Sequence, residues 1–251
     1  MRVSAIHTYP VKGCRGLGHD STTVEPWGLA GDRRWVIVDP GGVAVTQRDV
    51  HTLGQLRAEP GPGGLTLSYQ DREPLLVPPL RPEPQATAKV WGATVAATPA
   101  GTAADVWLSD CFGRPMRLLW LDDPAGRRFS PGAGEAGDVV SFVDALPLLL
   151  TNTASLHRLN DWIAEGGSDE GPLPMHRFRP NLVVDGAEPF QEDQWIGTTL
   201  HIGQVPFRVV RGCGRCLVTT IDQATGETGK EPCCRWAATA TSTGNCCSGC
   251  T

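Results

Sequence analysis

Short runs of alternating apolar and polar residues dominate the chain and predict β-strands joined by turns. Residues 34–39 are typical: a β-rich run closes at Pro40-Gly41-Gly42, and residues 43–47 follow as the second arm of a hairpin. The strands expected in this way cover residues 2–9, 34–39, 43–47, 65–69, 89–98 (a pair around Gly92), 181–185, 198–203, 207–211 and 216–221. The pattern therefore predicts a protein made largely of sheet.

Two segments carry the spacing of three and four residues that is typical of helices. The first has Thr102 as its expected N-terminal cap and stops at Gly113, and the second follows residues 146–153 and ends at Gly166. Their apolar faces are Ala104, Trp107, Leu108 and Cys111 in the first helix, and Leu156, Leu159 and Ile163 in the second. With 30 glycines and 21 prolines in 251 residues, we expect a mainly β (α+β) chain with few helices, long enough for one large domain or two modest ones.

Charge and hydropathy exclude several classes of protein. The net charge is −5 and no long basic run occurs, so a nucleic-acid polymer is not an expected partner. No apolar stretch approaches the roughly 18 residues of a membrane-spanning helix. The first residues, 1–13, lack the apolar region of a signal peptide. We therefore expect a cytoplasmic protein without a membrane partner.

The segment RGCGRCLVTTID, residues 211–222, is the sharpest candidate for chemistry. Cys213 and Cys216 flank Gly214-Arg215, and a thiolate is a soft ligand for molybdenum, copper(I), zinc or an iron–sulfur cluster. Arg215 would help a neighbouring thiol to ionise, and Gly214 would let the backbone approach a ligand closely. The alternative is two ordinary, half-buried cysteines at the end of a strand.

Zinc is the rival metal. Cys213-x-x-Cys216 and Cys247-x-x-Cys250 form a CxxC pair, a pattern typical of structural zinc sites. The two halves are further apart than in a compact zinc ribbon. A structural zinc protein therefore remains an alternative hypothesis.

Basic residues precede three of the predicted strands. Lys12 and Arg15 lie in residues 9–16, Arg33 and Arg34 follow Asp32, and Arg177 and Arg179 precede Pro180. Each set could be solvated, or all three could converge on an anion such as a phosphate. Asp144 lies inside the apolar run 141–156, where a carboxylate needs a partner, a function or a place in a turn.

These fragments, taken in order, resemble the MOSC-domain family, in particular its amidoxime-reducing and hydroxylaminopurine-resistance members. The matching pieces are YPVKG, GDRRW, TQR, VDALPLLLTNTASLHRLN, FRPNLVVDGAEPFQEDQW, IGQVPFRVV, CGRCLVTTID and TGETGKEP. The series from FRPNLVV to the C-x-R-C motif is specific to that family. The resemblance covers residues 1–232 and implies a MOSC N-terminal β-barrel domain (1–121) followed by a MOSC β-barrel domain (122–251).

The resemblance also implies a cofactor and the residues that bind it. Cys216, the second cysteine of the motif, would bind the molybdenum of a molybdenum–molybdopterin cofactor. The other residues that the family pattern carries over are Lys12 and Arg33 on the pterin phosphate, Arg179, Asp144 beside the metal as a catalytic group, and Asn152, Gly214 and Arg215 lining the pocket. Gly13 is also expected to bind the cofactor but departs from the family pattern, since relatives usually have serine there: a hydroxyl contact to the cofactor would be lost, while a backbone N–H could remain.

The implied activity is reduction of small N-hydroxylated compounds such as amidoximes, hydroxylamines and N-hydroxylated bases. No ferredoxin-like cysteine set follows, so electrons would come from a separate ferredoxin, flavodoxin or cytochrome-type protein. A second hypothesis is a carrier of the cofactor or of sulfur without turnover, related to the MOSC domains fused to pyridoxal-phosphate cysteine desulfurases. With only Lys12, Lys89 and Lys230, the chain offers no obvious Schiff-base lysine.

The end of the chain departs from the family pattern. Five of the nine cysteines fall in residues 233–251, whose composition differs from the rest. A back-translation with GC-rich codons, read one nucleotide earlier, gives LLPLGRHRHVDGKLLFGLH, which contains the GKLLFG that the family has here. We therefore expect a frameshifted tail and missing C-terminal strands, a hypothesis that resequencing the gene would test.

Overall fold

The computed structural model describes residues 1–128, 135 and 137–233. The chain divides into two compact units that interleave in sequence. Unit 1 comprises Met1–His7, Leu148–Asp222 and the chain from Glu227 onward, and unit 2 comprises Thr8–Pro147 and Gln223–Gly226. The domain boundary expected after residue 121 stays a prediction.

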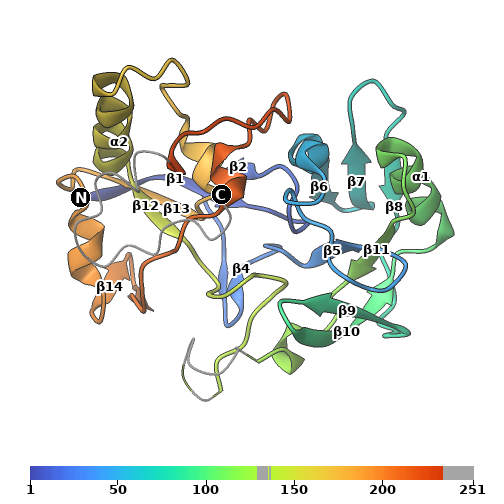
Figure 1. The fold of residues 1–251 in the computed structure, drawn as a ribbon. Coiled ribbons are helices and arrows are strands. Elements are labelled where there is room, and N and C mark those ends of the chain that lie inside the picture. The colour runs from blue at the N-terminus through green and yellow to red at the C-terminus, as the bar shows by residue number, and fades with distance from the viewer. Residues whose placement is uncertain (129–134, 136, 234–251) are drawn as a thin grey trace. The chain divides into compact units, whose positions relative to one another are not determined.

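The described part of unit 2 contains a four-stranded and a three-stranded antiparallel sheet, a short two-stranded one and one α-helix (Figure 1). The first sheet has the order β5 (Trp35–Val38), β11 (Arg117–Trp120), β10 (Ala93–Pro99) and β9 (Ala86–Val90). The second has the order β6 (Arg57–Gly61), β7 (Gly64–Ser68) and β8 (Leu75–Val77). Also present are α1 (Thr102–Phe112), β2 (Leu17–His19), the β3 (Val24–Glu25)–β4 (Gly28–Leu29) pair and the 3₁₀ turns η1 (His51–Gln55) and η2 (Pro124–Gly126).

Strand β5 explains the packing of unit 2. Its residues alternate between two apolar clusters: Ile37 packs in one, while Val36 and Val38 pack in the other. A strand buried on both faces needs a continuous apolar run, which is what RWVIV provides. The first cluster includes Leu65 and Leu67 of β7, whose side chains alternate with less buried ones along that strand.

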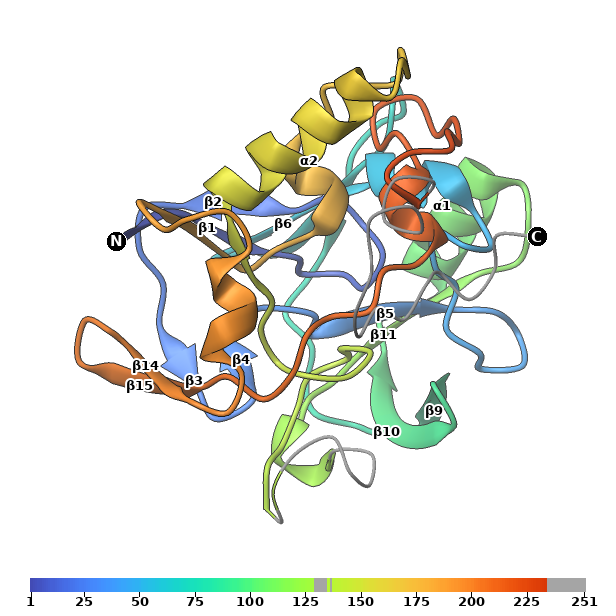
Figure 2. The ribbon, with the colours of Figure 1, turned by 60° about the vertical axis from the view of Figure 1, so that its left-hand side comes forward.

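Unit 1 is built on three strands and a helix. β1 (Arg2–Thr8) pairs antiparallel with β13 (Leu182–Asp185), and β12 (Leu150–Asn152) pairs parallel with the other edge of β13. Helix α2 (Thr153–Glu165) connects the two parallel strands and can be followed in Figure 2. The remaining elements are the hairpin β14 (Thr199–Ile202)–β15 (Val205–Arg208) and the 3₁₀ turns η3 (Met175–Phe178), η4 (Gln191–Trp195) and η5 (Leu217–Thr220).

The FRPN motif has a structural asparagine. Asn181 is fully buried, its side-chain oxygen accepts from the Leu149 N–H (3.2 Å), and its amide nitrogen donates to the His7 carbonyl (3.1 Å). The Leu149 carbonyl in turn accepts the Asn181 backbone N–H at 2.8 Å. One side chain therefore joins the end of β1 to the segments that enter β12 and β13.

The mainly β prediction is confirmed, with α1 and α2 as the α-helices of the described residues. Both helices end where expected, at Gly113 and Gly166, although Thr102 is the first residue of α1 and not its cap. Residues 43–47 form only isolated bridges. The strand expected over 216–221 is wrong: this segment contains the η5 turn, in which Thr219 and Thr220 donate their hydroxyls to carbonyls three residues back.

The expected frameshifted tail lies almost wholly outside the described residues, which end at Cys233. The missing C-terminal strands therefore stay a prediction. Among the described residues, no helix is both long and apolar enough to cross a membrane.

Candidate functional site

The predicted site residues fall into two groups, one in each unit. Lys12, Gly13, Arg33 and Asp144 belong to unit 2, and the structure brings three of them together. Asn152, Arg179, Gly214, Arg215 and Cys216 belong to unit 1.

The Lys12–Asp144 ion pair is the centre of the group in unit 2. Lys12 is 6% exposed, and its ammonium donates to Asp144 and, at 2.9 Å, to the Phe142 carbonyl. Burial lowers the pKa of Lys12 to about 8, although the Asp144 carboxylate opposes the shift. Burial would raise the pKa of Asp144, but Lys12, helped by Arg48 and Trp91, outweighs burial and holds that pKa below its usual value.

Further cations surround this pair. Arg33 and Arg127 each depress the pKa of Lys12, and Arg48 helps to lower the pKa of Asp144. The guanidinium of Arg127 donates to the carbonyls of Ser141 and Val143, and burial lowers its pKa to about 10. These two bonds hold the segment that leads to Asp144. So dense a set of partly desolvated cations suits a bound anion.

The side chain of Arg33 is held in place by Asp32, the residue before it. Asp32 is 1% exposed, forms an ion pair with Arg33, and accepts the Tyr9 backbone N–H at 2.7 Å. The Arg33 guanidinium also lies 4.7 Å from the centroid of the Tyr9 ring. Arg34, by contrast, donates to the Leu121 carbonyl at 2.6 Å and thereby joins the end of β11.

The backbone conformation at residue 13 explains why a glycine stands there. Its φ is +82°, and an added Cβ would lie 3.0 Å from a methyl carbon of Leu53. The Gly13 carbonyl accepts from the Gln47 side chain at 2.7 Å. A serine, as the family pattern has, would be strained in this conformation, so the loss of a hydroxyl at this position follows from the local backbone.

Cys216 lies at the start of the η5 turn in unit 1. Its side chain is half-buried, while Cys213 is exposed. The turn is held from η3: Arg177 donates to the Thr220 carbonyl and to the Asp222 carboxylate, both at 2.9 Å. From the sequence, Arg177 was only a candidate for anion binding. Nothing in the sequence indicates that it holds the η5 turn.

Arg215 and Arg179 lie near the same two turns. The Arg215 guanidinium is 5.3 Å from the centroid of the Phe178 ring, and Arg179 ends η3 in the left-handed conformation (φ +55°). Gly214 is exposed, and an added Cβ would meet no described atom within 4 Å. The chain itself thus gives no steric reason for glycine there, and its ligand-approach role stays a prediction.

Both the oxygen and the nitrogen of the Asn152 side-chain amide form hydrogen bonds within the protein. Asn152 caps α2 by accepting the Ala154 N–H at 3.1 Å, and it donates to the Glu188 carbonyl (2.7 Å) and the Glu192 carboxylate (3.1 Å). Asn152 is 1% exposed. The cofactor contact expected for it stays a prediction.

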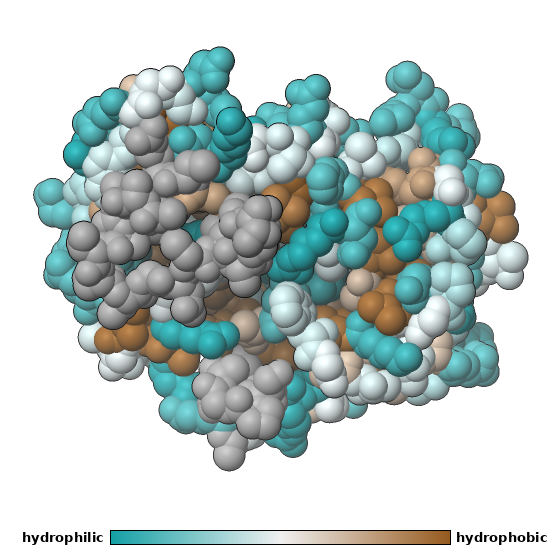
Figure 3. Space-filling model, viewed as in Figure 1, coloured by the Kyte–Doolittle hydropathy of each residue, from teal (hydrophilic) through white to brown (hydrophobic). Residues whose placement is uncertain are grey.

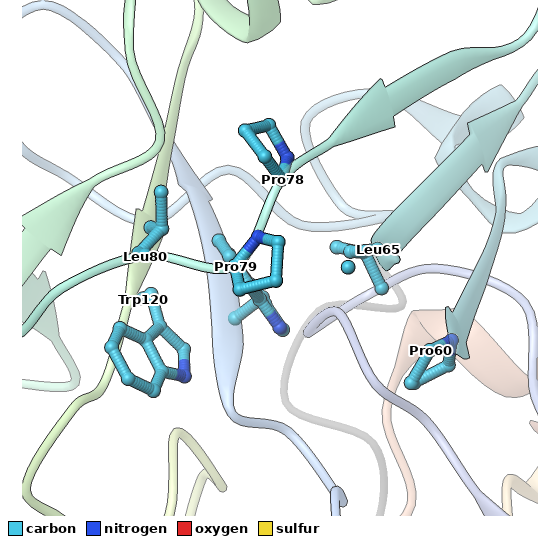
Figure 4. A pocket seen from close by; sticks show the side chains of 8 residues that line it. Pro60, Leu65, Pro78, Pro79, Leu80 and Trp120 are labelled. Carbon is cyan, nitrogen blue, oxygen red and sulfur yellow. The ribbon is translucent and has the colours of Figure 1, made fainter. Parts of the chain in front are cut away.

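A separate cavity in unit 2 has different chemistry. It measures about 240 Å³ and is lined by Trp35, Pro60, Gly64, Leu65, Pro78, Pro79, Leu80 and Trp120 (Figure 4). None of these side chains is charged, so the cavity does not suit an anionic group. Elsewhere on one face of the molecule, exposed apolar atoms occur as small patches among hydrophilic ones (Figure 3).

The described residues contain no group of three or more His, Cys, Asp or Glu side chains that could hold a metal ion. They therefore give no support to a zinc site. Cys247 and Cys250 lie outside those residues. The zinc hypothesis therefore stays an alternative.

Comparison with known proteins identifies the family. Residues 1–115 match the model of the MOSC N-terminal beta barrel domain, and residues 137–251 match that of the MOSC domain. The chain belongs to the MOSC family. This MOSC protein has lower similarity to a solved Bordetella bronchiseptica protein, at 19% identity with a TM-score of 0.32 over 41% of the chain and 88% of the solved chain.

Two kinds of curated relative resemble this MOSC protein. Molybdenum cofactor sulfurase of Danio rerio is 31% identical over 89% of the chain and 28% of the relative. Mitochondrial amidoxime-reducing component 1 of Mus musculus is 30% identical over 92% of the chain and 68% of the relative, and that of Homo sapiens is 30% identical over 92% and 69%. The chain thus spans less than a third of the sulfurase.

The Lys12 ammonium can be tested directly, because the protein has only three lysines. We expect an NMR titration of lysine side chains, assigned with Lys12→Arg, to give a pKa of about 8 for Lys12. Asp144→Asn should lower it further, since the carboxylate favours the charged ammonium. An unchanged Lys12 pKa in Asp144→Asn would contradict the ion pair.

The same shift has a consequence for stability. The pKa of Lys12 is about 8 in the folded protein and ~10.4 in an unfolded chain. Between these values the unfolded state binds more protons, so stability rises with pH across this window. The cost of burying the ammonium is complete below about pH 8 and is relieved as the pH rises. Urea denaturation at several pH values should show a smaller rise for Lys12→Met than for the wild type.

Proposed function

We propose that this chain binds the molybdenum–molybdopterin cofactor through the Cys216 thiolate and reduces small N-hydroxylated compounds. The observation that carries the proposal is Cys216 itself: a half-buried thiol at the start of η5, in the segment that matches the C-x-R-C pattern. The names of the relatives, an amidoxime-reducing component and a molybdenum cofactor sulfurase, support a connection with molybdenum cofactor, and the first of them supports the reductase activity.

Each unit, taken by itself, has residues that suit one chemical requirement of the cofactor. A molybdenum centre needs a soft ligand, which a thiolate supplies. A pterin phosphate needs desolvated cations, and Lys12, Arg33 and Arg127 provide them around one exposed carboxylate, Asp144. When bound, molybdenum would supply the two-electron chemistry that removes oxygen from an N–OH group.

Asp144 would orient the substrate. Its side chain is 48% exposed, and its lowered pKa keeps it ionised at neutral pH. An ionised carboxylate accepts hydrogen bonds and donates none, so it would accept one from the N–OH or N–H group of the substrate. Asp144→Ala with full activity and full cofactor loading would contradict this role.

Elemental analysis tests the cofactor and its ligand. The protein and two variants, Cys216→Ser and Cys213→Ser, would be expressed in a host that makes molybdenum cofactor. We expect near-stoichiometric molybdenum in the wild type and in Cys213→Ser, and almost none in Cys216→Ser. Molybdenum retained in Cys216→Ser would refute the ligand assignment, and zinc in place of molybdenum would favour the CxxC alternative.

Turnover separates the reductase from a carrier. Reduction of N–OH to N–H and water consumes two electrons and two protons, which a chemical reductant and solvent can supply in the assay. In the cell we propose a separate donor protein of the ferredoxin, flavodoxin or cytochrome type. A molybdenum-loaded protein that never reduces an N-hydroxylated compound would favour the second candidate, a cofactor or sulfur carrier like the MOSC part of a sulfurase that acts with pyridoxal phosphate.

A further inference from the structure

Trp91 occupies an unusual position at the tip of the β9–β10 hairpin. Val90 pairs with Ala93, which leaves Trp91 and Gly92 as a two-residue turn with φ values of +48° and +78°. Turns with positive φ at both positions favour Asn-Gly, and a bulky side chain at the first position is strained. Strained backbone of this kind clusters at active sites and ligand-binding segments, so the position is a candidate for function.

The surroundings of Trp91 are those of the candidate site. The Arg48 guanidinium lies 5.0 Å from the centroid of the Trp91 ring, and the Trp91 indole makes a small contribution to the lowered pKa of Asp144. Arg48 also lowers the pKa of Asp144. Thus one indole contacts both a cation and the proposed substrate-orienting carboxylate.

Most of the indole nevertheless faces solvent. Trp91 is 62% exposed, more than any other large apolar side chain among the described residues of unit 2. An Asn-Gly turn would close this hairpin with less strain, and the exposed ring contributes little to either apolar cluster of the unit. The fold therefore does not explain why a tryptophan stands here.

We propose that Trp91, backed by Arg48, is the surface on which the planar aromatic group of the substrate stacks beside Asp144. The inference rests on the proposed reductase function and deepens it. It predicts that the enzyme prefers aromatic N-hydroxylated substrates over aliphatic ones with the same reacting group. Stacking of a heteroaromatic ring on an aromatic side chain changes affinity by roughly tenfold or more.

Calorimetric titration of the molybdenum-loaded protein tests the inference with benzamidoxime and acetamidoxime, which share the reacting group and differ in the ring. We expect the wild type to bind benzamidoxime roughly tenfold more tightly. Trp91→Asn, whose Asn-Gly turn suits the backbone, should lose this preference. Trp91→Phe should keep most of it, because a ring remains although the indole N–H is lost. Leu76→Ala, at an apolar side chain 55% exposed on β8, is the surface control.

The outcomes are separable. Equal binding of the two probes by the wild type, or an undiminished preference in Trp91→Asn, overturns the inference. An equal loss in Trp91→Phe and Trp91→Asn also overturns it, since the indole N–H to Asp144 would then be the whole role. A ring preference that follows Trp91 in a protein that does not reduce either probe would support the stacking surface and refute the proposed function.

Discussion

Replacing Asp32 by alanine is expected to destabilise the protein by about 3–5 kcal/mol, the range for removing one partner of a buried ion pair. Asp32 is 1% exposed, and the Arg33 side chain that it pairs with is 14% exposed. The substitution leaves a guanidinium with little access to water, and it removes the acceptor of the Tyr9 backbone N–H. Urea denaturation of the full chain would measure the change.

Two further variants separate the charge from the hydrogen bond, and a third is a control at an exposed ion pair. Asp32→Asn keeps an oxygen for the Tyr9 N–H and should cost less than Asp32→Ala. The double variant Asp32→Asn, Arg33→Met removes the stranded cation and should recover part of the loss. In the same unit, Glu59→Ala breaks an ion pair with Arg57 whose side chains are 52% and 48% exposed, and it should change stability by less than about 1 kcal/mol. A similar loss in Glu59→Ala and Asp32→Ala would contradict the argument.

The hydrophobic pattern alone predicted the elements in which apolar residues are buried along a whole strand or along one face of a helix. Strand β5 has a continuous apolar run because both faces are buried, and α2 has a clear apolar face at Leu159 and Ile163. The segment after Cys216 was misassigned because LVTTI has β-branched residues, but its threonine hydroxyls donate to carbonyls three residues earlier in a 3₁₀ turn. Local hydrogen bonds of this kind compete with sheet pairing and leave no periodic signal.

Sequence motifs identified the candidate site residues. They did not identify the residues that contact those site residues and hold them in place. Arg48 lies in the TQR fragment that matched the family, but nothing in the sequence placed it near Asp144. Arg127 comes from a loop without any recognised motif, and its role follows from contacts 14 and 16 residues further along the chain. Trp91 did leave a signal, because a Trp-Gly pair stands where the predicted hairpin should have Asn-Gly. Such contacts depend on tertiary structure, which a single sequence does not show.

The second large effect is expected on replacing Arg177, which holds the turn that follows Cys216. The Arg177 side chain is 10% exposed, and it joins η3 to the Thr220 carbonyl and to the Asp222 carboxylate. The Thr220 carbonyl also accepts the Gly229 N–H at 2.9 Å, so the turn after Cys216 is fixed from two sides. We expect Arg177→Ala to destabilise this segment by about 2 kcal/mol, in the range of one or two charged hydrogen bonds partly screened by solvent at Asp222.

The consequence for Cys216 is measurable without cofactor. A local loss of about 2 kcal/mol corresponds to a roughly thirtyfold larger population of the opened segment. Alkylation of Cys216, followed by peptide mass spectrometry, should therefore accelerate by about that factor in Arg177→Ala. Cys14, which is fully buried in unit 2, serves as the internal reference and should react no faster.

Arg177→Lys is the matched variant, because it keeps the positive charge and loses the paired donors that reach both oxygens. Its Cys216 should react at a rate between those of wild type and Arg177→Ala. If Cys216 and Cys14 accelerate together, Arg177 stabilises the whole chain and not this turn. If Cys216 alone accelerates, the thiol is held in place by a residue that never needs to touch the metal, and molybdenum loading should fall in the same order across the three proteins.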